Sequence, residues 1–212
     1  MRQQNVKLLG TVWLSCYFVL QYNCVFLQLK IGITMYNLVS IKEFARYVAL
    51  SLLSKGYSVS PLKLQKILYY QQAWHMVFFG RKNPLFIDAP EAWVNGPVYP
   101  VIYRQYKDMV PGMCDHLKLD NFGVKDEKEL PKIQKGLSDK LSLTADEFGL
   151  LESVNNLYGS KTQNQLILAT HSEKPWIDAR GDLLPFEFSK TPISLDTMYA
   201  YYKERYDRNR AK

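Results

Sequence analysis

Two histidines and one glutamate are the residues of this sequence best suited to proton transfer. A histidine and a carboxylate that converge on a substrate can act as general base and general acid, so His75, Glu91 and His171 could form a hydrolase-type site. Their spacing does not show that they converge. His75 falls among aromatic residues of a helical segment, and His171 falls at the end of another, where it can bind the last helix carbonyls. We therefore expect structural histidines and no enzymatic activity, with the hydrolase as a minor alternative.

Other catalytic or cofactor sites leave no motif in the sequence. It contains no glycine-rich phosphate loop, no H-E-x-x-H and no G-x-S-x-G. The three cysteines, Cys16, Cys24 and Cys114, are an odd number without C-x-x-C spacing, which argues against a disulfide framework and a zinc site. We expect no metal, no cofactor and a reducing, cytoplasmic location.

The positive charge of the chain raises the alternative of a DNA-binding regulator. The formal net charge is +7, but residues 1–34 carry three bases and no acid, so only +4 remains for residues 35–212. The 15 tyrosines could stack on bases. No cluster of Arg and Lys lies beside a helix-turn-helix pattern, however. We therefore do not expect nucleic acid as a partner.

The N-terminus contains an apolar stretch of 22 residues without a charge, from Leu8 to Leu29. Such a stretch is long enough to cross a bilayer as a helix, although Gln21, Asn23 and Gln28 interrupt it. Three interpretations stay open: a membrane anchor at residues 8–29, a cleaved signal peptide, or an upstream extension of a protein that starts at Met35. The predicted domain begins at residue 35 and the apolar extension is residues 1–34.

Capping residues and helical spacing predict a mainly α fold for residues 35–212. Ser40 with Glu43 forms a candidate capping box, and Ser60 before Pro61 begins a longer, central helix that ends at Gly80. Short extended pieces at 85–87 and 91–94 predict a small β-hairpin or ribbon. The predicted helices cover residues 40–55, 60–79, 100–108, 144–159 and 162–171, with a last helix from Ser194.

Residues 111–143 are poorly periodic and are predicted to be an irregular insert. Their charge cluster at 125–129 is typical of a solvated loop or a short hairpin. The sequence thus predicts a single compact helical domain with a minor β element and one irregular insert.

Three blocks of the chain carry a family resemblance. The first runs from Leu62 to Tyr70 and is followed by Trp74 and His75, the second runs from Glu91 to Pro100, and the third starts at Thr170. They resemble, in order, a K-L-Q-K-L-L-Y core with a W-H pair, an E-A-W-x-x-G-P-V-x-P block and a T-H-x-x-x-P-W-x-x-A-R ending. Together these blocks resemble the Panacea domain, the SocA-like antitoxin family. The family-motif and candidate partner-binding residues are Lys63, Gln65, Lys66, Tyr69, Trp74, Glu91, Trp93, Gly96, Pro97, Tyr103, His171, Pro175 and Trp176.

The resemblance implies a helical protein-binding module of a toxin–antitoxin system. Such a module neutralises a cognate toxin protein either by direct occlusion or by handing it to a protease. Family members pair with unrelated toxins, so the domain does not identify the toxin. Because interface hot spots are enriched in Trp, Tyr and Arg, we expect Trp93, Tyr103 and Trp176 to be the residues to probe. Core packing is the competing interpretation for Trp93.

Overall fold

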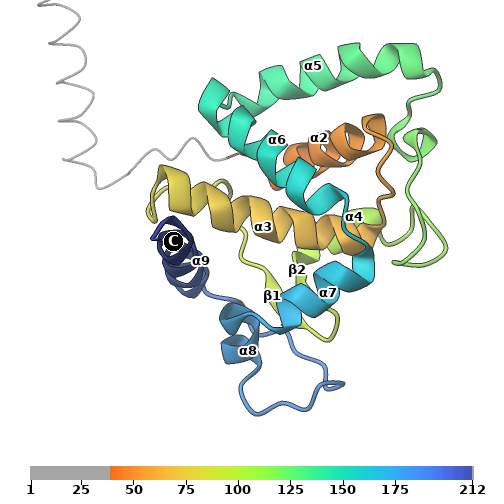
Figure 1. The fold of residues 1–212 in the computed structure, drawn as a ribbon. Helices are drawn as coiled ribbons and strands as arrows, with labels where there is room; N and C mark the ends of the chain where they lie inside the picture. The colour runs from red at the N-terminus through yellow and green to blue at the C-terminus, as the bar shows by residue number, and fades with distance from the viewer. Residues whose placement is uncertain (1–38, 212) are drawn as a thin grey trace, which may run out of the picture. The chain divides into compact units, whose positions relative to one another are not determined.

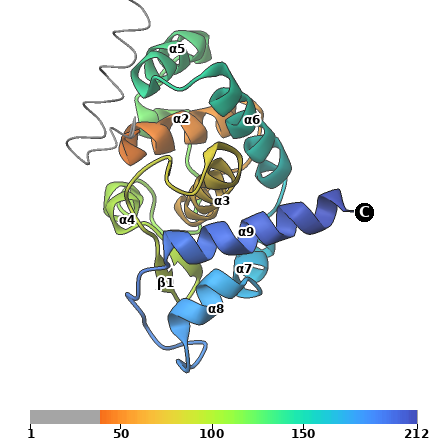
Figure 2. The same cartoon turned by 90° about the vertical axis from the view of Figure 1, so that its left-hand side faces the viewer.

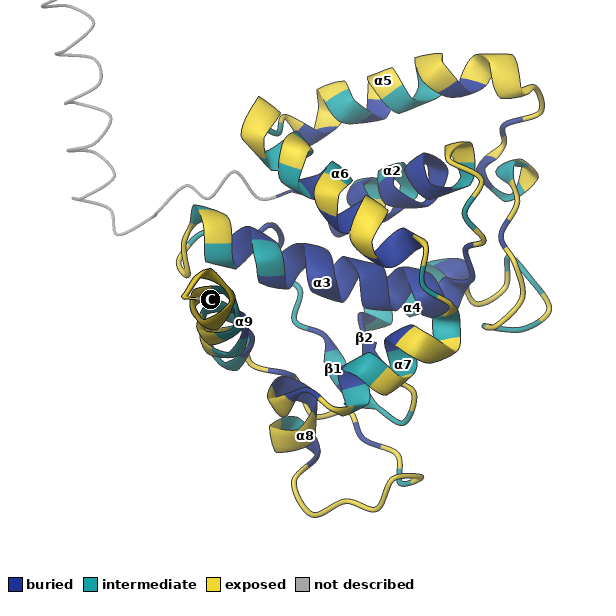
Figure 3. Cartoon of the chain, in the orientation of Figure 1, coloured by how far each residue is buried: buried dark blue, intermediate teal, exposed yellow. Residues whose placement is uncertain are grey.

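The computed structural model describes residues 39–211, and its centre is the helix α3, Pro61–Phe79. The Oγ of Ser60 accepts the amide of Lys63 at 3.0 Å, and Pro61 occupies the first turn, where its missing amide costs nothing. Gly80 ends the helix with a φ of 106°. Almost every side chain of the first four turns is buried (Figure 3), so α3 is covered on all sides.

Helices surround α3 on most of its circumference (Figures 1 and 2). α2 and α6 lie on one side of it and α9 on another, while α5 packs on the outer face of α2. The bounds of these helices are α2, Ile41–Ser54; α5, Leu130–Leu141; α6, Ala145–Gly159; and α9, Leu195–Arg210.

A two-stranded antiparallel hairpin packs against α3 from below in Figure 1. Strand β1, Glu91–Trp93, pairs with β2, Gly96–Val98, so that Glu91 faces Val98. Residues 191–193 extend the outer edge of β1, with Ala92 donating its amide to the Thr191 carbonyl at 2.9 Å. Three short helices complete this side: α4, Pro100–Tyr106; α7, Gln163–His171; and α8, Lys174–Arg180.

The predicted fold class is confirmed, because the described residues are mainly helical with one small hairpin. Thr144 with Glu147 and Thr162 with Gln165 form the capping boxes of α6 and α7. Ser40 precedes α2, but its side chain makes no capping bond.

Residues 85–87 form no strand, so of the predicted hairpin or ribbon only the irregular ribbon describes this segment. The side-chain amide of Gln72, on α3, binds the backbone there instead: its Oε1 accepts the Leu85 amide at 2.9 Å and its Nε2 donates to the Phe86 carbonyl at 2.7 Å. Since a buried side chain satisfies these groups, no strand partner is needed.

The prediction of a wholly irregular insert at residues 111–143 is wrong. The insert contains the 3₁₀ turns η1, Leu119–Phe122, and η2, Glu127–Glu129, followed by α5. Leu130, Leu137 and Leu141 are buried on the α5 face that packs against α2. α8 is likewise absent from the predicted helices, and Pro175 lies in its first turn.

Within residues 39–211, no helix combines the length and hydropathy that a membrane span requires. The predicted extension, residues 1–34, with its apolar stretch at 8–29, lies outside the described residues, so the three interpretations of it stay predictions.

Candidate functional site

Lys66 is the most deeply buried charged residue of the motif blocks, with none of its surface exposed. Its ammonium donates a hydrogen bond to the Pro97 carbonyl at 2.8 Å, and no carboxylate of residues 39–211 forms a salt bridge with it. Burial lowers the pKa of Lys66 well below its usual value, because the charged form loses its water. Lys66 therefore ties α3 to the hairpin.

Gly96 allows the hairpin to approach Lys66 closely. Its φ is 89°, and a Cβ there would lie 2.6 Å from the Thr170 Oγ1 and 2.8 Å from the Lys66 Cε. Both the conformation and the space therefore require glycine. We call the group of Lys66, Gly96, Pro97, Thr170 and His171 the motif hub.

Trp176 connects His171 of the motif hub to strand β1 of the hairpin. The two rings stack with centroids 4.2 Å apart, and the Trp176 Nε1 donates to the Trp93 carbonyl at 3.0 Å. Burial lowers the pKa of His171, the charge of Lys66 lowers it further, and a hydrogen bond with the Val94 backbone opposes both. Trp176 is only 8% exposed, so it offers a partner little surface. Pro175, beside it, is buried in the first turn of α8.

Lys63 and Gln65 are used within the fold. The Lys63 ammonium donates to the carbonyls of Ser58 at 2.8 Å and Gly159 at 2.7 Å. Gln65 accepts the Tyr99 amide at 2.8 Å and donates to the carbonyl of the same residue at 3.4 Å.

Sequence reasoning missed Glu173, which lies at the junction of α3, α8 and α9. Only 3% of Glu173 is exposed, and its carboxylate accepts hydrogen bonds from Tyr202 at 2.6 Å and Tyr70 at 3.4 Å, with Arg205 at 3.5 Å. Burial raises the pKa of Glu173 to about 7 against the opposing effects of Tyr202 and Arg205. Because these partners are distant in the sequence, no local motif indicates the carboxylate.

An aromatic cluster surrounds Glu173 and includes two motif residues. Tyr69 is fully buried and packs edge-on against Tyr202, with ring centroids 6.0 Å apart. Trp74 is partly exposed, and its Nε1 donates to the Tyr158 hydroxyl at 3.0 Å.

The three residues of the hydrolase alternative have separate partners. His75 bonds to Glu147 at 3.0 Å and to the Asn83 carbonyl at 3.1 Å, whereas Glu91 accepts the Trp93 Nε1 at 2.6 Å. His75 also lies nine residues along α3 from Lys66, about 14 Å at the helical rise, while His171 neighbours Lys66. The structure thus does not assemble these three side chains around one point.

A partly exposed aromatic surface lies over the hairpin. The Trp93 ring contacts Tyr103 at 4.9 Å and Phe188 at 5.7 Å between centroids. These three rings, which we call the Trp93 face, line a shallow cavity of about 210 Å³ together with Leu62, Val94, Asn95, Val98, Met113 and Cys114.

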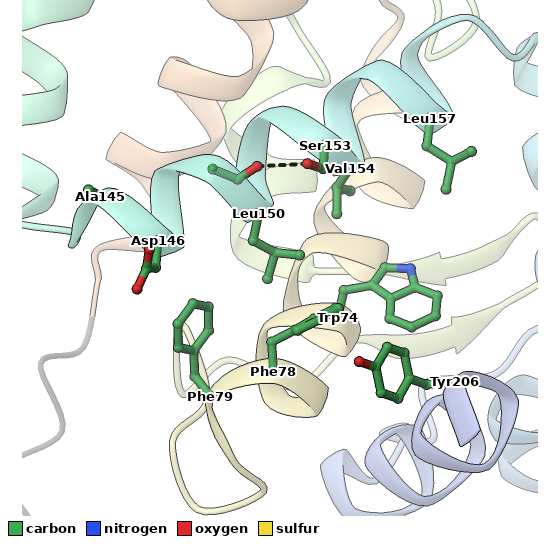
Figure 4. A pocket seen from close by; sticks show the side chains of 11 residues that line it. Trp74, Phe78, Phe79, Ala145, Asp146, Leu150, Ser153, Val154, Leu157 and Tyr206 are labelled. Carbon is green, nitrogen blue, oxygen red and sulfur yellow. Dashed lines mark hydrogen bonds between the residues drawn. The ribbon is translucent and has the colours of Figure 1, made fainter. Parts of the chain in front are cut away.

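A larger apolar groove of about 680 Å³ lies between α3, α6 and α9 (Figure 4). Phe78 and Phe79 of α3 face Leu150 of α6, with Asp146 at one end of the groove and Tyr206 of α9 at the other. Trp74 is the one motif residue in its lining. No group of three or more metal-ligating side chains occurs anywhere in residues 39–211.

The helical bundle, the hairpin and the motif hub that joins them form a helical domain with a minor β element. The family model described as "Antitoxin SocA-like, Panacea domain" matches residues 64–177, and the chain belongs to this family. It is similar to "Antitoxin SocA" of Caulobacter vibrioides (strain NA1000 / CB15N), with 33% identity over 139 residues, 62% of this chain and 68% of that protein. No solved structure matches the chain.

Proposed function

We propose that this protein is the antitoxin of a toxin–antitoxin pair and binds a cognate toxin protein in a stoichiometric complex. Membership of the SocA-like antitoxin family carries the proposal. The separate hydrogen-bond partners of His75 and Glu91 also favour a binding role over hydrolysis.

The Trp93 face combines two partly exposed motif residues with Phe188 and is the surface proposed to contact the toxin. Trp93 and Tyr103 are partly exposed, unlike the buried Lys66, Gln65 and Tyr69. Aromatic side chains on a rigid support are the usual anchors of protein interfaces. Lys66 and Trp176 supply that support by fixing the hairpin from beneath.

A growth assay tests the proposal. The open reading frame next to this gene is induced alone and then together with the full chain. Growth arrest that co-expression relieves supports antitoxin function. Arrest that the full chain does not relieve would contradict it, as would an adjacent product without toxicity.

The fate of the toxin separates the two routes of neutralisation. If the antitoxin occludes the toxin, toxin levels stay constant during rescue and the two proteins co-purify in equal amounts. If the antitoxin is an adaptor for a protease, toxin levels fall and a protease-deficient strain loses the rescue.

The same assay with a chain that begins at Met35 tests the N-terminal extension. Equal rescue by both chains supports neutralisation in the cytoplasm without residues 1–34. Rescue by the full chain alone supports membrane attachment through residues 8–29 as part of the function.

A further inference from the structure

Residues 181–190, between α8 and α9, form a loop with an unusual number of exposed apolar side chains. Phe186 is 75% exposed and Phe188 61%, with Leu184 at 52% and Leu183 at 40%. This loop, which we call the apolar loop, projects away from the helices (Figures 1 and 3). Because it is convex, a partner must offer it a concave apolar surface.

A buried arginine holds the apolar loop in one conformation. Arg180 is 5% exposed, and its Nη2 donates to the carbonyls of Leu184 at 2.6 Å and Glu187 at 2.8 Å. Its Nη1 donates to the Ala92 carbonyl of β1 at 3.2 Å. The guanidinium also lies 5.0 Å from the centre of the Trp176 ring. One side chain thus connects the apolar loop to both the hairpin and Trp176.

The acceptors of Arg180 are neutral carbonyls, and no carboxylate of residues 39–211 forms a salt bridge with it. Burying a guanidinium without a counter-ion is costly for folding. The gain is an ordered loop, which the Glu187 carboxylate reinforces by accepting the Leu184 amide at 2.7 Å. A loop ordered before binding loses less entropy when it binds. Burial of Arg180 therefore costs the fold stability but orders the apolar loop for binding a partner.

The apolar loop continues the surface assigned to the toxin but lies outside the family match. Phe188 belongs to both the apolar loop and the Trp93 face. The family model matches residues 64–177, so the motif hub falls inside the match and residues 181–190 fall beyond it.

We propose that the apolar loop inserts Leu184 and Phe186 into an apolar cleft of the toxin, and that Arg180 is the residue that positions it. This inference rests on the antitoxin function proposed above. It specifies the partner as a protein with a concave apolar site, flanked by the surface that covers Trp93 and Tyr103.

The test compares two variants of the full chain that change exposed leucine or phenylalanine to serine. One carries Leu184→Ser with Phe186→Ser, and the control carries Leu168→Ser on α7, where the leucine is 70% exposed. Exposed positions such as these tolerate substitution without unfolding. The probe is the purified product of the adjacent open reading frame, with affinity measured by calorimetry and rescue measured by growth.

We expect the loop variant to bind the toxin at least about 30-fold more weakly than the natural chain, which is the size of effect seen when an interface hot spot is removed. We also expect the loop variant to fail to rescue growth. The Leu168→Ser control should bind and rescue like the natural chain. If the natural chain binds and the loop variant stays within threefold of it, the loop inference is overturned and the antitoxin function stands. If the natural chain itself neither binds nor rescues, the antitoxin function and this inference are both overturned.

Arg180→Met separates positioning from contact. We expect chymotrypsin to cut this variant after Phe186 or Phe188 at least tenfold faster than the natural chain, and the affinity to fall although Leu184 and Phe186 are intact. Unchanged cleavage together with unchanged affinity would show that Arg180 does not order the loop.

Discussion

The apolar loop and the groove between α3, α6 and α9 are both exposed and apolar, but one projects and the other is hollow. The apolar loop is held through Arg180 to the hairpin and to Trp176, whereas the groove is lined by residues outside the motif blocks except for Trp74. The difference indicates which surface the motif serves. The buried motif residues shape the hairpin and the loop, so recognition is expected on that side.

The largest expected effect of breaking this support is at Gly96. Gly96→Ala places a Cβ 2.6 Å from the Thr170 Oγ1 at a φ of 89°, and we expect a loss of about 4 kcal/mol from the combined strain and overpacking. Gly123→Ala is the matched control: its φ is 73°, but nothing lies within 4 Å of the added Cβ. There we expect a loss of about 1 kcal/mol from backbone strain alone. Urea unfolding measures both, and equal losses would contradict the close approach of the hairpin to Lys66.

A second predicted effect is a pH dependence of stability at Glu173, which precedes α8 and accepts a hydrogen bond from Tyr202 of α9. Its pKa in the folded chain is about 7, above the value of an ordinary glutamate. Folding therefore favours the protonated form, and the stabilising contribution of Glu173 falls as the pH rises from about 4.5 to about 7. Across this pH window, the contribution of Glu173 to the free energy of unfolding falls by about 3 kcal/mol.

Glu173→Gln tests this sign, because glutamine cannot ionise and keeps an oxygen for Tyr202. The difference in unfolding free energy between the variant and the natural chain should shift in favour of the variant as the pH rises through that window, and stay level above pH 8. Thermal unfolding at several pH values measures the difference. A difference that stays flat across this window would show that the carboxylate is not buried as described.

The smallest effect is expected in the groove. Phe78→Ser with Leu157→Ser changes two side chains that are 51% and 55% exposed, so we expect a stability loss below about 1 kcal/mol and full rescue of growth. Lost rescue in a folded variant would place the toxin site in the groove and not on the apolar loop.

The sequence predicted most of the helices because their ends carry local signals. Ser60 and Pro61 at α3, and the capping boxes of α6 and α7, act within four residues and can be recognised without the fold. α5 was missed although Leu130, Ile133, Leu137 and Leu141 recur at helical spacing and Pro131 lies in the first turn, where proline is tolerated. Leu130, Leu137 and Leu141 are the buried members of this stripe, on the face that packs against α2.

The candidate site was less predictable, because its decisive contacts join distant residues. Lys66 and Gly96 were recognised as motif residues, but their mutual packing depends on how the hairpin crosses α3. Arg180 reaches the Ala92 carbonyl, 88 residues earlier, and Glu173 reaches Tyr70, 103 residues earlier. Trp176 was expected at an interface and is instead buried beneath the hairpin. Such burial depends on tertiary packing rather than on residue type.

One measurement tests the central claim most directly: growth of cells that express the adjacent open reading frame together with the full chain in its natural form, with the Leu184→Ser/Phe186→Ser loop variant, or with the Phe78→Ser/Leu157→Ser groove variant. We expect rescue by the natural chain and the groove variant, and growth arrest with the loop variant. Rescue by the loop variant and arrest with the groove variant would contradict the claim.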